Sequence, residues 1–517
     1  MKSANPYKMV VERNLPRVLA LFDTDKSSDS YGFGDRFHWA WNLIDFGNGT
    51  FQGVAHGLAR LIHANILPEW ISEESILARI DAMFSGADIL RRADGSMEEA
   101  FPYEGSFCVT ALVAYDLLTT IELLEPKLSS TVKQGYLNTI RPMIAYLHKA
   151  DEKHAFISNH LATAVAALYK WSKLTGEEGS KRGGEILDRI LSNQSSEGWY
   201  LEYEGADPGY QSLCTYYLAD VLQTTQDEKL KQSLQKSVEF LQYFAHPDGS
   251  FGGVYGSRNT RFYYPAGVEY LASDSEPASI LSQFMRISVG DNRVVGLDAI
   301  DEPNLVPMFN AYCWAAALYE QHPDTDISQT VPSDSEDTFR VDFKGAGLIL
   351  DKGKEHYSIV SVFKGGVVYH FHKGKLKILD AGSLFKDSKG TKFSTQSYNK
   401  TNKVNISNDS ITIESLLTPF SKKRFQPWQM VILRMMNLTV MRTYSLRELV
   451  KKVLVKLLIT GSASNKGTVS RNISFGENLQ LEDSTNMKVK LTKLSEVKNF
   501  VAIHMASKGY WQKQDTE

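Results

Sequence analysis

The chain has 517 residues, which is too long for one ordinary core. Of these residues, 43% are hydrophobic and 23% are charged, a composition typical of globular proteins. Its formal net charge of −3 argues against general nucleic-acid binding, so we expect no nucleic-acid partner. The three cysteines, Cys108, Cys214 and Cys313, lie far apart in apolar runs and form no CxxC pair. Their pattern favours buried free thiols, and we expect neither a metal nor a cofactor.

The first 30 residues contain no uninterrupted apolar run and no small-residue cleavage site. We therefore expect no signal peptide and no transmembrane span, and a cytoplasmic location.

Residues 31–322 have the apolar periodicity of helices, and they are rich in Ala and Leu. Loops of acidic, glycine and aromatic residues begin at Asp94, Glu197 and Asp248, and a further hairpin begins at Asp151. These starts recur about every 50 residues, the length of one helical hairpin with its connections. Stacked hairpins form a solenoid or a closed ring, and we expect an α/α toroid whose loops gather on one concave rim.

After a polar, proline-bearing linker at 323–336, residues 337–517 change character. Short apolar runs separated by Gly, Lys and Asp predict an antiparallel, β-sandwich-like domain. One exception is an amphipathic helical insert near 445–460, where Leu446, Leu449 and Val450 share an apolar stripe and lysines lie between. This insert packs on its own domain or touches a membrane peripherally, in which case the protein lies at the inner membrane.

The rim loops offer aromatic, amide and charged side chains, a combination that suits a carbohydrate because rings stack on sugar faces and polar groups bind hydroxyls and carboxylates. We expect a polysaccharide or oligosaccharide as the substrate; the oligomeric state is left open. The candidate substrate-binding residues are Trp41, Glu104, Glu204, Asp207, Arg258, Asn259 and Tyr264.

Three motifs carry a resemblance to a known family. They are SNHLATAVAAL from Ser158, EGWYLEYEGADPGYQ from Glu197, and VVYHFHKGKLKILDAG from Val367. Together with a helical toroid followed by a β-domain, they resemble the heparinase II/III-like and alginate-lyase-like polysaccharide lyases. The loops also resemble those of proteins encoded with bacterial surface-polysaccharide assembly enzymes. The resemblance implies β-elimination as the activity, with Asn159, His160, Tyr210 and His372 as catalytic residues.

The chemistry of β-elimination requires that the carboxylate beside the abstracted proton be neutralised. Asn159 is placed to bind that carboxylate, His160 or Arg258 to add positive charge, and Tyr210 to act as base or acid. Three acids, Glu202, Glu204 and Asp207, argue the other way because they repel a polyanion. The same acids keep two alternatives open: a glycoside hydrolase or epimerase that uses rim carboxylates, and a non-catalytic glycan-binding or assembly protein.

Overall fold

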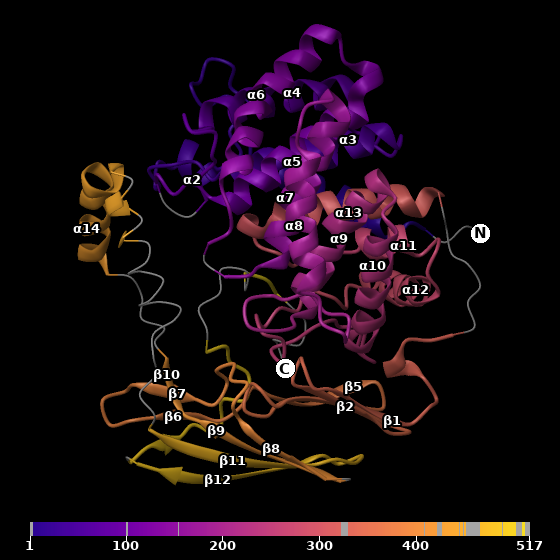
Figure 1. Cartoon of the computed structure of the whole chain (residues 1–517), viewed down its shortest axis with the longest axis vertical. Helices are drawn as coiled ribbons and strands as arrows, with labels where there is room; N and C mark the ends of the chain where they lie inside the picture. The colour runs from indigo at the N-terminus through magenta and orange to yellow at the C-terminus, as the bar shows by residue number, and fades with distance from the viewer. Residues whose placement is uncertain are drawn as a thin grey trace.

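The computed structural model describes most of the chain: residues 4–99, 102–153, 155–321, 329–407, 409–420, 426–443, 445–447, 449–450, 466–488, 490–502 and 509–511. Helices occupy its first part and antiparallel sheets follow, so the predicted fold class is confirmed (Figure 1). The greater part of the helical insert predicted near 445–460 lies outside the described residues.

The helices of the first part form an inner and an outer layer. The inner helices are α3 (Val54–His63), α5 (Phe107–Leu124), α7 (Ser158–Thr175), α9 (Pro208–Thr225), α11 (Ala266–Leu271) and α13 (Leu305–Gln321). Each packs against the next, and α13 packs against α3, which closes the ring. The outer helices are α1 (Pro6–Leu19), α4 (Glu73–Leu90), α6 (Ser130–Lys149), α8 (Ser180–Ser192), α10 (Glu228–Leu241) and α12 (Glu276–Gly290); the short α2 (Arg36–Trp39) lies beside them.

Composition and capping explain the inner helices. Nearly every side chain of α5 is buried, as expected for an Ala- and Leu-rich helix enclosed on all sides. Ser106 caps α5 by accepting a hydrogen bond from the Val109 amide, and Asp207 caps α9 in the same way at Tyr210. By length and composition the segment Phe107–Lys127 is apolar enough to cross a membrane, but 89% of that window is buried inside the structure.

The N-terminal helix α1 packs against the last helices of the ring. The Asn5 side-chain amide donates to the Ala316 carbonyl at 2.9 Å on α13. The Tyr7 hydroxyl donates to Glu269 at 2.7 Å on α11. Residues 6–19, part of the segment that the sequence set apart from the toroid, thus pack against its last helices.

Three antiparallel sheets make up the second part. The first is a meander of β1 (Phe339–Phe343), β2 (Leu348–Lys352), β3 (His356–Ser361), β4 (Val367–His372) and β5 (Lys375–Asp380). The second has the order β10 (Thr418–Phe420), β7 (Lys392–Ser394), β6 (Leu384–Lys386), β13 (Thr492–Lys493). The third has the order β12 (Gln480–Met487), β11 (Gly467–Ser474), β9 (Ser410–Leu416), β8 (Lys403–Ile406).

The first sheet has two buried faces because side chains alternate along each strand. Val360 and Val368 face Ile411 and Ile473 of the third sheet, which makes a sandwich. The opposite face, which includes Tyr369, joins the core of the toroid. The sheets therefore lie across one end of the ring, against its loops (Figure 1).

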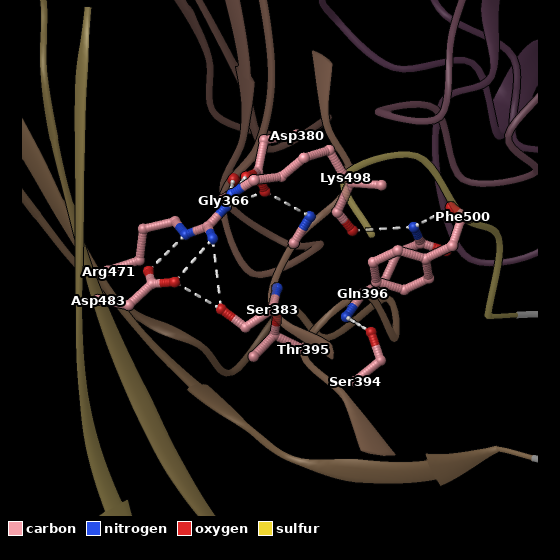
Figure 2. Close-up of polar contacts among 12 residues, drawn as sticks. Gly366, Asp380, Ser383, Ser394, Thr395, Gln396, Arg471, Asp483, Lys498 and Phe500 are labelled. Carbon is pink, nitrogen blue, oxygen red and sulfur yellow. Dashed lines mark hydrogen bonds and ion pairs between the residues drawn. The ribbon is translucent and has the colours of Figure 1, made fainter. Parts of the chain in front are cut away.

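A buried arginine ties the sheets together. Arg471 of β11 bonds Asp380 and Asp483 at 2.7 Å and donates to the Gly366 carbonyl at 2.9 Å (Figure 2). Its guanidinium also contacts the Ser383 hydroxyl at 3.3 Å, so every charge in the cluster has several partners. Such satisfaction is what permits a charge in an otherwise apolar sandwich.

Candidate functional site

Backbone hydrogen bonds join three rim loops at the end of the ring that faces the sheets. The Tyr203 amide donates to the Phe156 carbonyl at 3.0 Å, which joins the loop before α9 to the loop before α7. The Ser257 amide donates to the Ala206 carbonyl at 2.8 Å, which joins the loop before α11. The first turns of α7 and α9 and residues 254–260 are thereby held in one rim cluster.

Asn159 and Glu202 form the centre of this rim cluster. The Asn159 amide nitrogen donates to Glu202 Oε1 at 2.8 Å, and both side chains are buried. Burial raises the pKa of Glu202 to about 7, although His160, Asn159 and Arg258 act in the opposite direction. Glu202 is therefore divided between its neutral and charged forms at neutral pH.

His160 adds a positive charge beside this pair. Its Nδ1 lies 2.8 Å from Glu152 Oε2, and the Cys108 thiol hydrogen-bonds the same ring. Burial alone lowers the pKa of His160, but Cys108 and Glu152 outweigh it and hold that pKa well above its usual range. This shift favours the positively charged form of the imidazole, and 23% of the side chain is exposed.

Arg258 supplies a second cation. Its guanidinium lies 3.9 Å from the centre of the Tyr203 ring, a close cation–π contact. Tyr203 itself has a φ of +58°, a left-handed conformation that is uncommon outside glycine. Backbone conformations of this kind cluster at functional sites. The loop before α9 therefore brings an aromatic face, and the loop before α11 an arginine, to the edge of the Asn159–Glu202 pair.

Asp207 has a structural task in the same loop. Its carboxylate accepts hydrogen bonds from the amides of Tyr210 at 3.2 Å and Arg258 at 2.8 Å, and from the Thr260 hydroxyl. It is fully buried, and burial raises its pKa. Asp207 therefore joins the start of α9 to the arginine-bearing loop and does not face solvent.

The β-domain reaches the rim cluster through Lys364, in the turn between β3 and β4. Its ammonium donates to the carbonyls of Val254 at 2.5 Å and Gly256 at 2.8 Å, and to the Asn259 side-chain oxygen. The side chain is fully buried, and burial lowers its pKa to about 7. Lys364 thus fixes the loop that carries Arg258 from the side of the β-domain.

Tyr398 is a second contribution of the β-domain, and its position explains Gly205. A Cβ atom at residue 205 would lie 2.0 Å from the Tyr398 hydroxyl oxygen, so any larger residue there would have to displace the Tyr398 side chain. That hydroxyl is buried and has no hydrogen-bond partner among the described residues. It lies beside Glu204 of the loop before α9.

The structure does not bring His372 to Tyr210. Tyr369 and Phe371 of β4 face the toroid, where the Phe371 ring lies 4.8 Å from His246. Strand alternation turns His370 and His372 to the other side: His370 contacts the Glu477 carbonyl at 3.1 Å, and His372 lies 3.9 Å from Glu355.

The remaining candidates are distributed around the rim. Tyr210 opens α9 half-buried, with its ring 5.3 Å from Phe262 in an edge contact. Tyr264 is buried in the same aromatic row. Glu104 is half-buried before α5, Glu204 is exposed, and Trp41 lies after α2 with 64% of its side chain exposed. Among the described residues no group of His, Cys, Asp or Glu is arranged to hold a metal ion.

The sequence missed Lys364, Tyr398, Cys108 and Glu152 as parts of this cluster. One signal was present for Lys364, a lone lysine followed by two glycines between two buried strand runs. Cys108 offered none, because its nearness to His160 depends on the packing of α5 against α7. Glu152 lies eight residues before His160, in the loop that leads into α7.

No family model matches the chain, and no curated protein matches its sequence. Among solved structures, chondroitin AC lyase from Streptomyces coelicolor A3, in complex with chondroitin sulphate, is similar with a TM-score of 0.50 and 9% identity, over 80% of this chain and 66% of that chain. Paenibacillus xanthan lyase is similar with a TM-score of 0.49 and 11% identity, over 80% of this chain and 45% of that chain. Heparinase III is similar with a TM-score of 0.48 and 11% identity, over 95% of this chain and 72% of that chain.

The chain thus spans less than half the length of the xanthan lyase chain. At 9% identity, the likeness to chondroitin AC lyase establishes the fold: a helical toroid followed by antiparallel sheets. This is the architecture that the sequence motifs implied.

Proposed function

We propose that the protein acts on a uronic-acid-containing polysaccharide or oligosaccharide by β-elimination at the rim cluster. The observation that carries this proposal is the buried Asn159–Glu202 pair, with the cations His160 and Arg258 beside it. An amide and a half-neutral carboxylic acid are able to hydrogen-bond a substrate carboxylate, while the two cations offset its charge as an enolate develops.

The burial of two of the three loop acids supports β-elimination, because buried acids repel a polyanionic substrate less than exposed ones do. Asp207 is enclosed by its three donors, and Glu202 is partly neutral at neutral pH. Glu204 remains as the exposed acid of the loop. The same enclosure leaves Asp207 unsuited to the carboxyl pair that a glycoside hydrolase requires.

Tyr210 is the proposed acid and base, because it begins α9 at the edge of the cluster and its amide is fixed by Asp207. In this scheme Tyr210 takes the proton alpha to the carboxylate and returns a proton to the leaving oxygen. The β-domain contributes positioning through Lys364, which holds the loop that carries Arg258.

The test is an ultraviolet absorbance assay with a panel of uronate polymers, since elimination creates an unsaturated sugar. We expect Tyr210→Phe to lower the rate by roughly 10²–10⁴-fold and Asn159→Ala by roughly 10²–10³-fold. Tyr169→Phe is the matched control, because Tyr169 lies about 15 Å from Asn159 along the axis of α7. This variant should keep the wild-type rate of elimination. New reducing ends without absorbance would establish hydrolysis instead, and binding without either product would establish a glycan-binding protein.

A further inference from the structure

Helix α14 (Pro427–Leu438) exposes most of its large apolar side chains. Six of them are exposed, from 45% at Met430 to 63% at Val431, with Trp428 at 62%, while Leu433 and Met436 are half-buried. Asn437 is the one side chain that the helix buries. Large contiguous apolar surfaces of this kind mark an interaction site.

The toroid extends this surface. Arg434 of α14 forms an ion pair with Asp45 at 3.2 Å and contacts the Leu43 carbonyl at 3.4 Å, so the helix stands beside α2 and away from the sheets (Figure 1). Three exposed apolar side chains lie in that neighbouring segment: Phe37, Trp41 and Leu43, each at least 49% exposed. We refer to the apolar residues of α14 with these three as the apolar face.

Charge distinguishes among the partners that such a face fits. The chain as a whole has a net charge of −3, yet residues 421–460 contain nine Lys and Arg residues and a single acid, Glu448. Arg434 and Arg442, on or just after α14, are exposed. Two copies of this basic region repel each other, which disfavours self-association, whereas an anionic surface attracts it.

The side-chain types agree with a lipid surface. Tryptophan prefers the level of the lipid headgroups, while Val, Ile, Leu and Met enter the acyl boundary. No Asp or Glu occurs in α14, so the helix has no anion to expel from an anionic bilayer. Sugar binding would instead require several hydrogen-bonding groups among the aromatic rings.

We propose that the apolar face docks on an anionic lipid bilayer, with α14 lying in the plane of the interface and the toroid held at the membrane surface. This proposal is independent of the reaction at the rim cluster. It places the membrane contact on α14, on Phe37 of α2 and on the segment that follows α2.

Co-sedimentation of the full chain with phosphatidylcholine vesicles, with and without phosphatidylglycerol, tests this proposal. We expect binding to the anionic vesicles, weaker binding to the neutral ones, and a loss of binding as salt shortens the screening length from about 10 Å at 0.1 M to about 3 Å at 1 M. The variant Trp428→Ser/Val431→Ser/Met435→Ser should lower the partition coefficient by at least roughly 10-fold.

The matched control is Trp70→Ser/Ile287→Ser, which removes exposed apolar side chains (56% and 62%) far from α14 along the chain and should bind as the wild type does. Equal thermal melts of both variants show that folding is retained. Failure of the wild type to bind anionic vesicles overturns the proposal, as does undiminished binding of the α14 variant. A dimer in light scattering that the α14 variant abolishes, without vesicle binding, would assign the face to a second copy.

Discussion

Glu202 provides a quantitative test of the rim cluster. The side chain is 3% exposed, and burial raises its pKa from 4.5 to about 7. The folded protein therefore holds this proton over a pH range in which the unfolded chain has released it. By linkage, the group's contribution is fully present below about pH 4.5 and is lost as pH rises to about 7, a change of about 3 kcal/mol in the free energy of unfolding.

Replacement by glutamine removes the titration and keeps a neutral group that is able to bond Asn159. We expect the unfolding free energy of the wild type to fall relative to Glu202→Gln by about 3 kcal/mol between pH 4.5 and about pH 7.5. Guanidinium denaturation followed by tryptophan fluorescence over this range measures the difference. Glu204→Gln, an exposed acid two residues away, should follow the wild-type curve. Parallel curves for wild type and Glu202→Gln would refute the burial-driven shift.

Two further substitutions test the contacts around the β-domain. Burial lowers the pKa of Lys364 to about 7, so the wild type should gain stability relative to Lys364→Met as pH rises from about 7 to 10. In the same variant, the amide hydrogens of residues 254–259 should exchange faster than in the wild type. Arg471 and Lys493 hold the pKa of Asp483 below its usual range, so the stability advantage of the wild type over Asp483→Asn should be present above about pH 4 and shrink as pH falls further. Thermal melts across each pH range measure both effects, and a difference that does not vary with pH would contradict them.

The fold was accessible from the sequence because its signals are local and repeated. Periodic Ala- and Leu-rich runs predict α5, α7 and α9, and the glycine-bearing loops before them recur at hairpin spacing. The change to short strands after residue 337 depends equally on local pattern. Neither the helical hairpins nor the later strands require knowledge of any distant contact to be predicted.

The arrangement of the site was only partly accessible, since it depends on which loops meet. Asn159 and Glu202 lie 43 residues apart and contact each other through the pairing of two loops. Lys364 meets Asn259 across 105 residues, a contact that nothing local specifies. Likewise, the motif around His372 did not show which side of β4 faces the toroid; the register of the first sheet decides that.

The packing of α1 against the last helices of the ring bears on how the chain is made. Asn5 meets Ala316 across 311 residues, so the first helix emerges from the ribosome long before its partner exists. At about 5–20 residues per second, the wait is roughly 15 to 60 seconds. During that time the apolar side of α1, which includes Tyr7, Val11 and Leu15, has no final packing surface. Synthesis of this protein is therefore expected to engage chaperones early, and the yield of folded chains should depend on how well α1 is protected until α13 is complete.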